Sequence, residues 1–185
     1  MIAELLSDAE IRMAKSVDAL RKELSGLRTG RASSALVERV PVEYYGNPTP
    51  MMKLASIHVP EPRLIVIQPF DKASFGAIEK AILKSDLGLN PTNDGKVIRL
   101  AIPPLTEERR RDMVKVSRRK AEEGRIAVRN VRRDALKDID EMETEKLVSS
   151  DEHARGFESL QRLTDRFVLE IEKVSHAKEA EIMEV

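Results

Sequence analysis

The fold of this chain is decided by residues 106–148, which read TEERRRDMVKVSRRKAEEGRIAVRNVRRDALKDIDEMETEKLV. At about 100° per residue, the apolar and small residues of this stretch gather on one side of a helix. They are Met113, Gly124, Ala127, Val128, Val131, Ala135 and Met142. The spacing therefore predicts one long helix with a packing face.

Cations form a row along another side of this predicted helix. The row consists of Arg111, Lys115, Arg118, Arg125, Arg129, Arg132 and Arg133. Glu122 is the only acid within it. A guanidinium is always charged and presents a planar fork of donors, which suits phosphate groups. The row indicates a polyanionic partner, and the alternative interpretation is an ordinary solvated helix face.

The overall charge of the chain does not indicate a partner, but the local distribution of charge does. The 185 residues carry a formal net charge of zero. Cations predominate in residues 107–137 and acids in residues 138–185, so a polyanion should bind in one orientation. The absence of cysteine excludes disulfides and thiolate metal sites. Because no apolar run reaches membrane-spanning length and no signal-peptide pattern is present, we expect a soluble cytoplasmic protein.

Two further segments carry apolar residues at helical spacing. The first runs from Ile2 to Leu27 and closes at Gly30, a residue type that often ends helices. The second includes Phe157 to Val174 and follows Ser149, Ser150 and Asp151, all of which suit an N-cap. Three long helices with matching apolar seams predict an antiparallel three-helix bundle.

The segment between the first two long helices has a different texture. All nine prolines lie between residues 41 and 104, and turn signals such as Asn47-Pro48 separate strand-like stretches. We expect strands at 40–45, 54–59, 64–68 and 96–102, and a helix at 74–85. The predicted fold class is α+β. Residues 1–30 and 105–185 form the bundle domain, and residues 31–104 form an inserted small α/β domain.

The chain crosses between these two domains at two short connections. One crossing lies at Gly30 and Arg31, and the other at Pro103, Pro104 and Leu105. Few contacts cross such a boundary, so paired short connections form a natural hinge. We expect the two domains to move as rigid bodies about these residues.

The sequence contains no convincing catalytic set. The histidines are scattered and lack metal-binding partners at suitable spacing. They are His58, His153 and His176. Gly88 to Val97 superficially resembles a phosphate loop, but the spacing of its glycines is wrong and Val97 replaces the required Ser or Thr. We interpret Asn93-Asp94-Gly95 as a hairpin turn, and we expect no enzyme activity, no metal and no cofactor.

The aromatic content indicates which kind of polyanion the arginine row could bind. Two tyrosines, four phenylalanines and no tryptophan equip the chain poorly for stacking single-stranded bases. The arginine row instead suits the backbone of folded nucleic acid. A helical adaptor or chaperone would not need such a row, and a DNA-architectural protein would show net positive charge. Arg28 and Arg31 add a second basic cluster beside the hinge.

Four motifs in the chain resemble those of the ribosome recycling factor family. They are LRTGRAS at 27–33, VIQPFD at 66–71, LNPTNDGKVIRLAIPPLTEER at 89–109 and VRNVRRDA at 128–135. The resemblance covers essentially the whole chain, in order and with family spacing. It implies an L-shaped molecule in which a three-helix bundle and an α/β domain are joined by a hinge.

The resemblance also implies a function. The protein would bind the large ribosomal subunit after termination and, with elongation factor G and GTP hydrolysis, split the subunits so that messenger and transfer RNA leave. The RNA-contacting residues of the family match Arg28, Arg31, Arg129, Arg132 and Arg133 here, with Asn130 beside them. We expect a monomer that binds ribosomal RNA and elongation factor G and does not bind a membrane.

Overall fold

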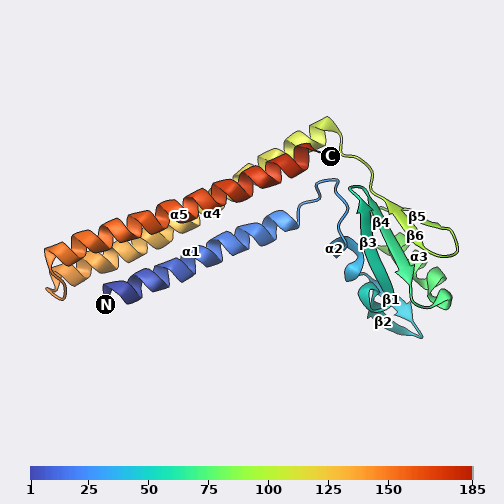
Figure 1. Ribbon diagram of the computed structural model, residues 1–185, viewed down its shortest axis with the longest axis horizontal. Coiled ribbons are helices and arrows are strands. Elements are labelled where there is room, and N and C mark those ends of the chain that lie inside the picture. The colour runs from blue at the N-terminus through green and yellow to red at the C-terminus, as the bar shows by residue number, and fades with distance from the viewer. Residues whose placement is uncertain (185) are drawn as a thin grey trace. The chain divides into compact units, whose positions relative to one another are not determined.

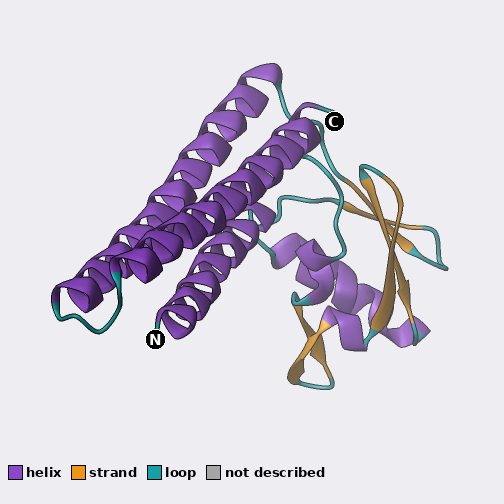
Figure 2. Ribbon diagram, turned by 60° about the vertical axis from the view of Figure 1, so that its left-hand side comes forward, coloured by secondary structure: helices purple, strands orange, loops and turns teal. Residues whose placement is uncertain are grey.

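Residues 1–184, which the computed structural model describes, form two units that differ in secondary structure (Figures 1 and 2). Residues 1–27 and 107–184 form a purely helical unit, called the bundle below. Residues 28–106 form the second unit, called the sheet unit, which contains all the strands. Within the described residues, no helix is both apolar and long enough to cross a bilayer.

The bundle consists of three long helices. They are α1 (Ile2–Ser25), α4 (Glu107–Thr144) and α5 (Ser150–Met183). Helix α4 runs antiparallel to the other two (Figure 1). The bundle core includes most of the residues that the apolar spacing predicts, among them Met13, Leu20, Val128, Phe167 and Ile171. Phe157, with which the predicted seam of the last helix begins, is exposed instead. The three predicted long helices and their antiparallel packing are thus confirmed.

Gly124 of α4 faces both of the other long helices. A Cβ atom added there would lie 3.4 Å from Cδ2 of Leu20 on α1 and 3.5 Å from Cδ1 of Ile171 on α5. A methyl group would therefore fit at this position, whereas a larger side chain would collide with both neighbours. Met113, at the beginning of the predicted packing face, is only half-buried.

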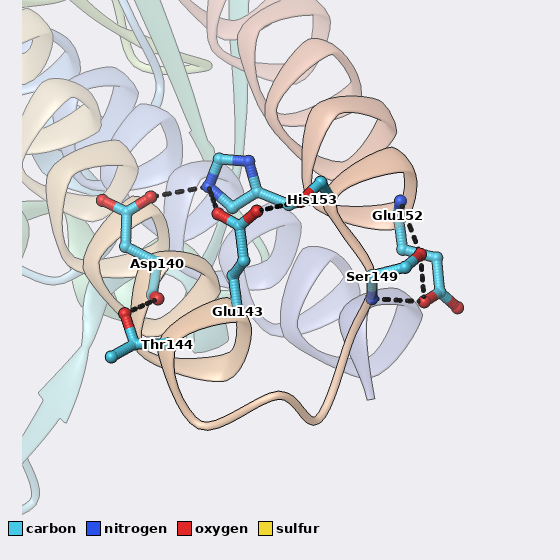
Figure 3. Close-up of polar contacts among 7 residues, drawn as sticks. Asp140, Glu143, Thr144, Ser149, Glu152 and His153 are labelled. Carbon is cyan, nitrogen blue, oxygen red and sulfur yellow. Dashed lines mark hydrogen bonds and ion pairs between the residues drawn. The ribbon is translucent and has the colours of Figure 1, made fainter.

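A short polar turn joins α4 to α5 (Figure 3). Helix α4 ends before the predicted residue 148 because Lys146 adopts a left-handed conformation with φ of 59°. The amides of Lys146 and Leu147 then donate to the carbonyls of Glu143 and Met142, a pattern that closes helix C-termini.

Of the three residues predicted to suit the N-cap of α5, Ser149 is the one that caps the helix. The Ser149 hydroxyl accepts a hydrogen bond from the Glu152 amide, and the Glu152 carboxylate accepts one from the Ser149 amide. This reciprocal capping box satisfies backbone donors that the first turn of a helix leaves free. The Ser149 amide and hydroxyl both donate hydrogen bonds to the Glu152 carboxylate, and these two bonds lower the pKa of Glu152.

The sheet unit is built from two antiparallel sheets and one helix of three turns. The larger sheet has the order β3-β4-β6-β5, and the smaller one is the β1-β2 hairpin. Their bounds are β1 Pro41–Tyr44, β2 Asn47–Pro50, β3 Ala55–Glu61, β4 Leu64–Pro69, β5 Pro91–Asn93 and β6 Ile98–Ala101. Helix α3 (Phe75–Lys84) contributes Ile78 and Ile82 to a core shared with Ile65, Ile67 and Leu100.

The four predicted strands and the predicted helix of this unit are confirmed, with small shifts at their ends. The sequence analysis missed β2, β5 and the short helix α2 (Ala35–Glu38). Asn47-Pro48, expected to form a turn, instead begins β2. The turn lies at Tyr45 and Gly46, whose positive φ values of 47° and 79° give the twist that tight hairpins require.

The interpretation of Asn93-Asp94-Gly95 as a hairpin turn is confirmed. This segment connects β5 to β6, and Gly95 has a φ of 86°. The Asp94 carboxylate accepts hydrogen bonds from the amides of Val97 and Lys96 and pairs with Arg99. These bonds lower the pKa of Asp94 to about 2. The carboxylate thus occupies the loop amides that a phosphate-binding loop would offer to its ligand.

Candidate nucleic-acid interface

The predicted arginine row lies along the flank of α4 that borders α5. Two of its members bond to α5 side chains, Arg118 to Glu179 and Arg132 to Gln161. The row therefore lies beside the contact between α4 and α5. Side chains of α5 bond to its arginines, and the spacing of residues on α4 alone did not reveal them.

Arg118 is compensated by an acid from the neighbouring helix. Its Nε and Nη2 atoms each donate to one oxygen of the Glu179 carboxylate at 3.0 Å. This paired geometry lowers the pKa of Glu179 and raises that of Arg118. The Glu179 side chain is only 20 % exposed. Arg118 thus ties α4 to α5, and its charge is largely balanced within the bundle.

Arg111, Arg125 and Arg129 have acids on their own helix. Arg111 pairs with Glu107 one turn earlier. Arg125 Nε donates to Glu122 at 2.8 Å, and Arg129 Nη1 lies 3.5 Å from the same carboxylate. The bond from Arg125 is the main cause that lowers the pKa of Glu122. Arg129 shares this acid at the longer distance and keeps a side chain that is 56 % exposed.

Uncompensated positive charge is concentrated at the C-terminal end of the row. Arg132 Nη1 donates to the neutral amide oxygen of Gln161 at 2.8 Å. Arg133 is exposed, and residues 1–184 offer it no acidic partner. Asn130 is exposed next to them. Lys115 is also exposed, but it lies more than three turns away from this group.

The remaining predicted residues belong to the sheet unit. Arg28 and Arg31 have exposed side chains, whereas Gly30 between them is buried. Gly30 has a φ of 77°, and a Cβ atom there would lie 3.1 Å from Cγ of Leu105. The two predicted connections therefore touch each other at Gly30 and Leu105. Pro103 and Pro104, which precede Leu105, are exposed.

Sequence reasoning missed the two α5 residues that meet the arginine row. It took Glu122 as the only acid of the row, but Glu179 also belongs to it. Gln161 and Glu179 are separated by about five full helical turns, so both lie on the same side of α5. Antiparallel alignment of α5 against α4 would have placed both of them beside the row.

One further polar cluster lies at the end of the bundle that holds the α4–α5 turn (Figure 3). His153 Nε2 of α5 lies 2.7 Å from Oδ1 of Asp140 and 3.6 Å from Oε2 of Glu143, both on α4. The hydrogen bond with Asp140 is the main cause that raises the pKa of His153. Residues 1–184 contain no cluster of His, Asp and Glu arranged to hold a metal ion.

Comparison with known proteins gives a consistent result. A family model described as ribosome recycling factor matches residues 20–183. The ribosome-recycling factors of Carboxydothermus hydrogenoformans and Syntrophomonas wolfei are 55% and 56% identical over 185 residues, covering 100% of both chains in each case.

Two solved structures extend this likeness to the fold. The solution structure of a ribosome recycling factor matches with a TM-score of 0.76 and 49% identity, covering 100% of this chain and 98% of that one. The second, a model of the T. thermophilus factor, appears with E. coli elongation factor G bound to the E. coli post-termination complex. It matches with a TM-score of 0.65 and 44% identity, covering 99% of each chain.

Proposed function

Because this chain belongs to the ribosome recycling factor family, we propose that it binds the large ribosomal subunit after termination. Together with elongation factor G and GTP, it splits the post-termination complex and releases messenger and transfer RNA. The full-length likeness to a factor described with elongation factor G on a post-termination complex supports this partner. In this proposal the protein is a cytoplasmic monomer that acts by binding to the ribosome. The GTP hydrolysis is supplied by elongation factor G.

The observation that carries the proposal is the uncompensated charge at Arg132 and Arg133, beside the exposed Arg129, which meets Glu122 only at 3.5 Å. Arginine forks bind phosphate oxygens by charge-assisted hydrogen bonds, which position a protein on folded RNA. In this proposal Asn130 adds a polar contact beside them, and Arg28 and Arg31 of the sheet unit also contact RNA. Arg111, Lys115, Arg118 and Arg125 extend the positive field along α4, although the acids that pair with three of them reduce their contribution.

The same proposal assigns the hinge to Gly30, Arg31, Pro103, Pro104 and Leu105. The positive φ of Gly30 and its close approach to Leu105 support a special backbone geometry at the paired connections. Elongation factor G can use the protein as a lever only if the two units rotate relative to each other about this point.

A salt series with purified large subunits tests the RNA contact. Arg132→Ala should weaken binding by about 1.5–3 kcal/mol, the usual range for a lost charge-assisted hydrogen bond. Its affinity should also fall less steeply with salt, because one phosphate contact fewer releases fewer cations. Thermal unfolding should show that the variant remains folded, since the substitution removes one hydrogen bond to Gln161 and leaves the apolar core of the bundle unchanged.

Arg119→Ala is the matched control. Arg119 is an exposed arginine on the same helix, about 140° around the axis from Arg132 and outside the row. The Arg119→Ala variant should bind large subunits with nearly parental affinity. If Arg132→Ala binds as the parent does, or binds poorly only because it has unfolded, the row is a solvated helix face and the proposal for its function is wrong.

A further inference from the structure

Arg132 differs from its neighbours in the arginine row because the only partner it has among residues 1–184 is neutral. Arg111, Arg118, Arg125 and Arg129 all approach carboxylates. Arg132 instead donates from Nη1 to the amide oxygen of Gln161 on α5. Its Nε atom is buried and has no hydrogen-bond partner in the described chain. A single amide oxygen therefore holds the guanidinium in place.

The orientation of that amide is fixed from its other end. Gln161 Nε2 donates to Oδ1 of Asp165, one turn further along α5, at 2.8 Å. An ionised carboxylate can only accept hydrogen bonds, so Gln161 must turn its NH₂ group toward Asp165. Its carbonyl oxygen then has to face Arg132, at 2.8 Å from Nη1. The three side chains form a directed chain across the α4–α5 seam.

A second residue on the same side of α5 also bonds to an arginine of α4, but with a different chemical group. Glu179, about five turns after Gln161, meets Arg118 with a carboxylate and compensates its charge. Gln161 has nearly the same length and shape as a glutamate, and it bridges the same two helices. The difference between the two contacts is therefore charge, since an amide orders the guanidinium without neutralising it.

We infer that Gln161 is a positioning residue that holds the Arg132 guanidinium in place for RNA phosphate and leaves its positive charge available. This inference rests on the proposed binding of RNA by Arg132. Fixing the rotamer before binding reduces the conformational entropy that the contact would otherwise lose. Asp165 orients Gln161 and stays one residue removed from the guanidinium.

Two variants separate positioning and charge from a merely structural role. Gln161→Glu keeps a bridge between α4 and α5 but neutralises Arg132, so affinity for vacant large subunits should fall about tenfold or more and the salt slope should decrease by about one. Gln161→Ala removes the bridge and keeps the charge, so affinity should fall roughly three- to tenfold at a nearly unchanged salt slope. Gln68→Glu makes the same chemical change at an exposed site of the sheet unit and should have little effect.

The effect must also depend on Arg132. In an Arg132→Ala background, Gln161→Glu should cause no further loss of affinity, and thermal unfolding should confirm that each variant is folded. If Arg132→Ala weakens binding but Gln161→Glu binds as the parent does, or weakens binding equally without Arg132, the positioning role is wrong while the proposed function stands. If Arg132→Ala itself binds as the parent does, the proposed RNA contact fails and this inference fails with it.

Discussion

At the residue scale, the partner of a charged side chain decides what that side chain can do. Arg118 and Arg132 lie on the same flank of α4, yet one meets a carboxylate and the other an amide. The carboxylate converts Arg118 into a helix-to-helix contact, whereas the amide leaves Arg132 with a charge that an external phosphate can meet. The same reasoning applies to His153, which forms an ion pair with Asp140 only when its imidazole is protonated.

The pairing of His153 with Asp140 should make the stability of the bundle depend on pH. Because folding raises the pKa of His153, its protonated form stabilises the folded state fully below the unfolded pKa of about 6.5. This contribution is lost as pH rises through the folded pKa. His153→Ala should therefore destabilise the protein more at about pH 5.5 than at about pH 8.5, as measured by denaturant unfolding.

Asp140→Asn provides the control for this prediction. It removes the partner that raises the pKa and leaves the imidazole in place, so its destabilisation should show the same dependence on pH. Glu143, at 3.6 Å from His153 Nε2, leaves a weaker residual effect. A difference between parent and His153→Ala that stays constant over this pH range would contradict the assignment.

At the scale of the elements, the packing of α4 depends on the size of residue 124. Gly124→Ala should stabilise the bundle by up to about 1 kcal/mol, because alanine favours helix and its Cβ would meet Leu20 and Ile171 at ordinary contact distances. Gly124→Leu should destabilise it by about 1–3 kcal/mol or more through overpacking. Denaturant unfolding of the two variants should thus give opposite signs.

Gly156 on α5 offers a comparison for the same substitution. A Cβ atom there would lie 3.1 Å from Cγ2 of Ile2, closer than the contacts at Gly124. Gly156→Ala should therefore gain less stability than Gly124→Ala, or lose some. If Gly124→Leu is accommodated without loss, the close approach of the helices at this position does not constrain the bundle.

The elements also show which parts of the structure the sequence can predict. Long helices reveal themselves because an apolar residue recurs every turn for many turns, and Ser149 adds a local capping signal. The strand β2 carries no such signal, since its four residues include Pro48 and Pro50 and none of them is buried. Gln161 was missed for another reason. Its role depends on which residue of α4 lies opposite, and that register is a property of the packed bundle.

At the scale of the whole molecule, the chain passes between the two units at the connections near Gly30 and Leu105. The proposed hinge predicts that each unit is internally rigid while the distance between them varies. The chain has no cysteine, so paired cysteines can carry spectroscopic labels without background. Ala154→Cys in the bundle and Lys72→Cys in the sheet unit are exposed positions that report the distance between units.

Pulsed electron-spin measurements of this pair should give a broad distance distribution in the free protein and a changed one on the ribosome. The control pair Ala19→Cys and Ala154→Cys lies within the bundle and should give one narrow distance in both states. Gly30→Val should shift the distribution between units alone, because a branched residue is strained at a φ of 77° and its Cβ would contact Leu105. A single narrow distance between units, equal in the free and bound protein, would rule out the hinge, because a lever that cannot bend cannot transmit the motion of elongation factor G.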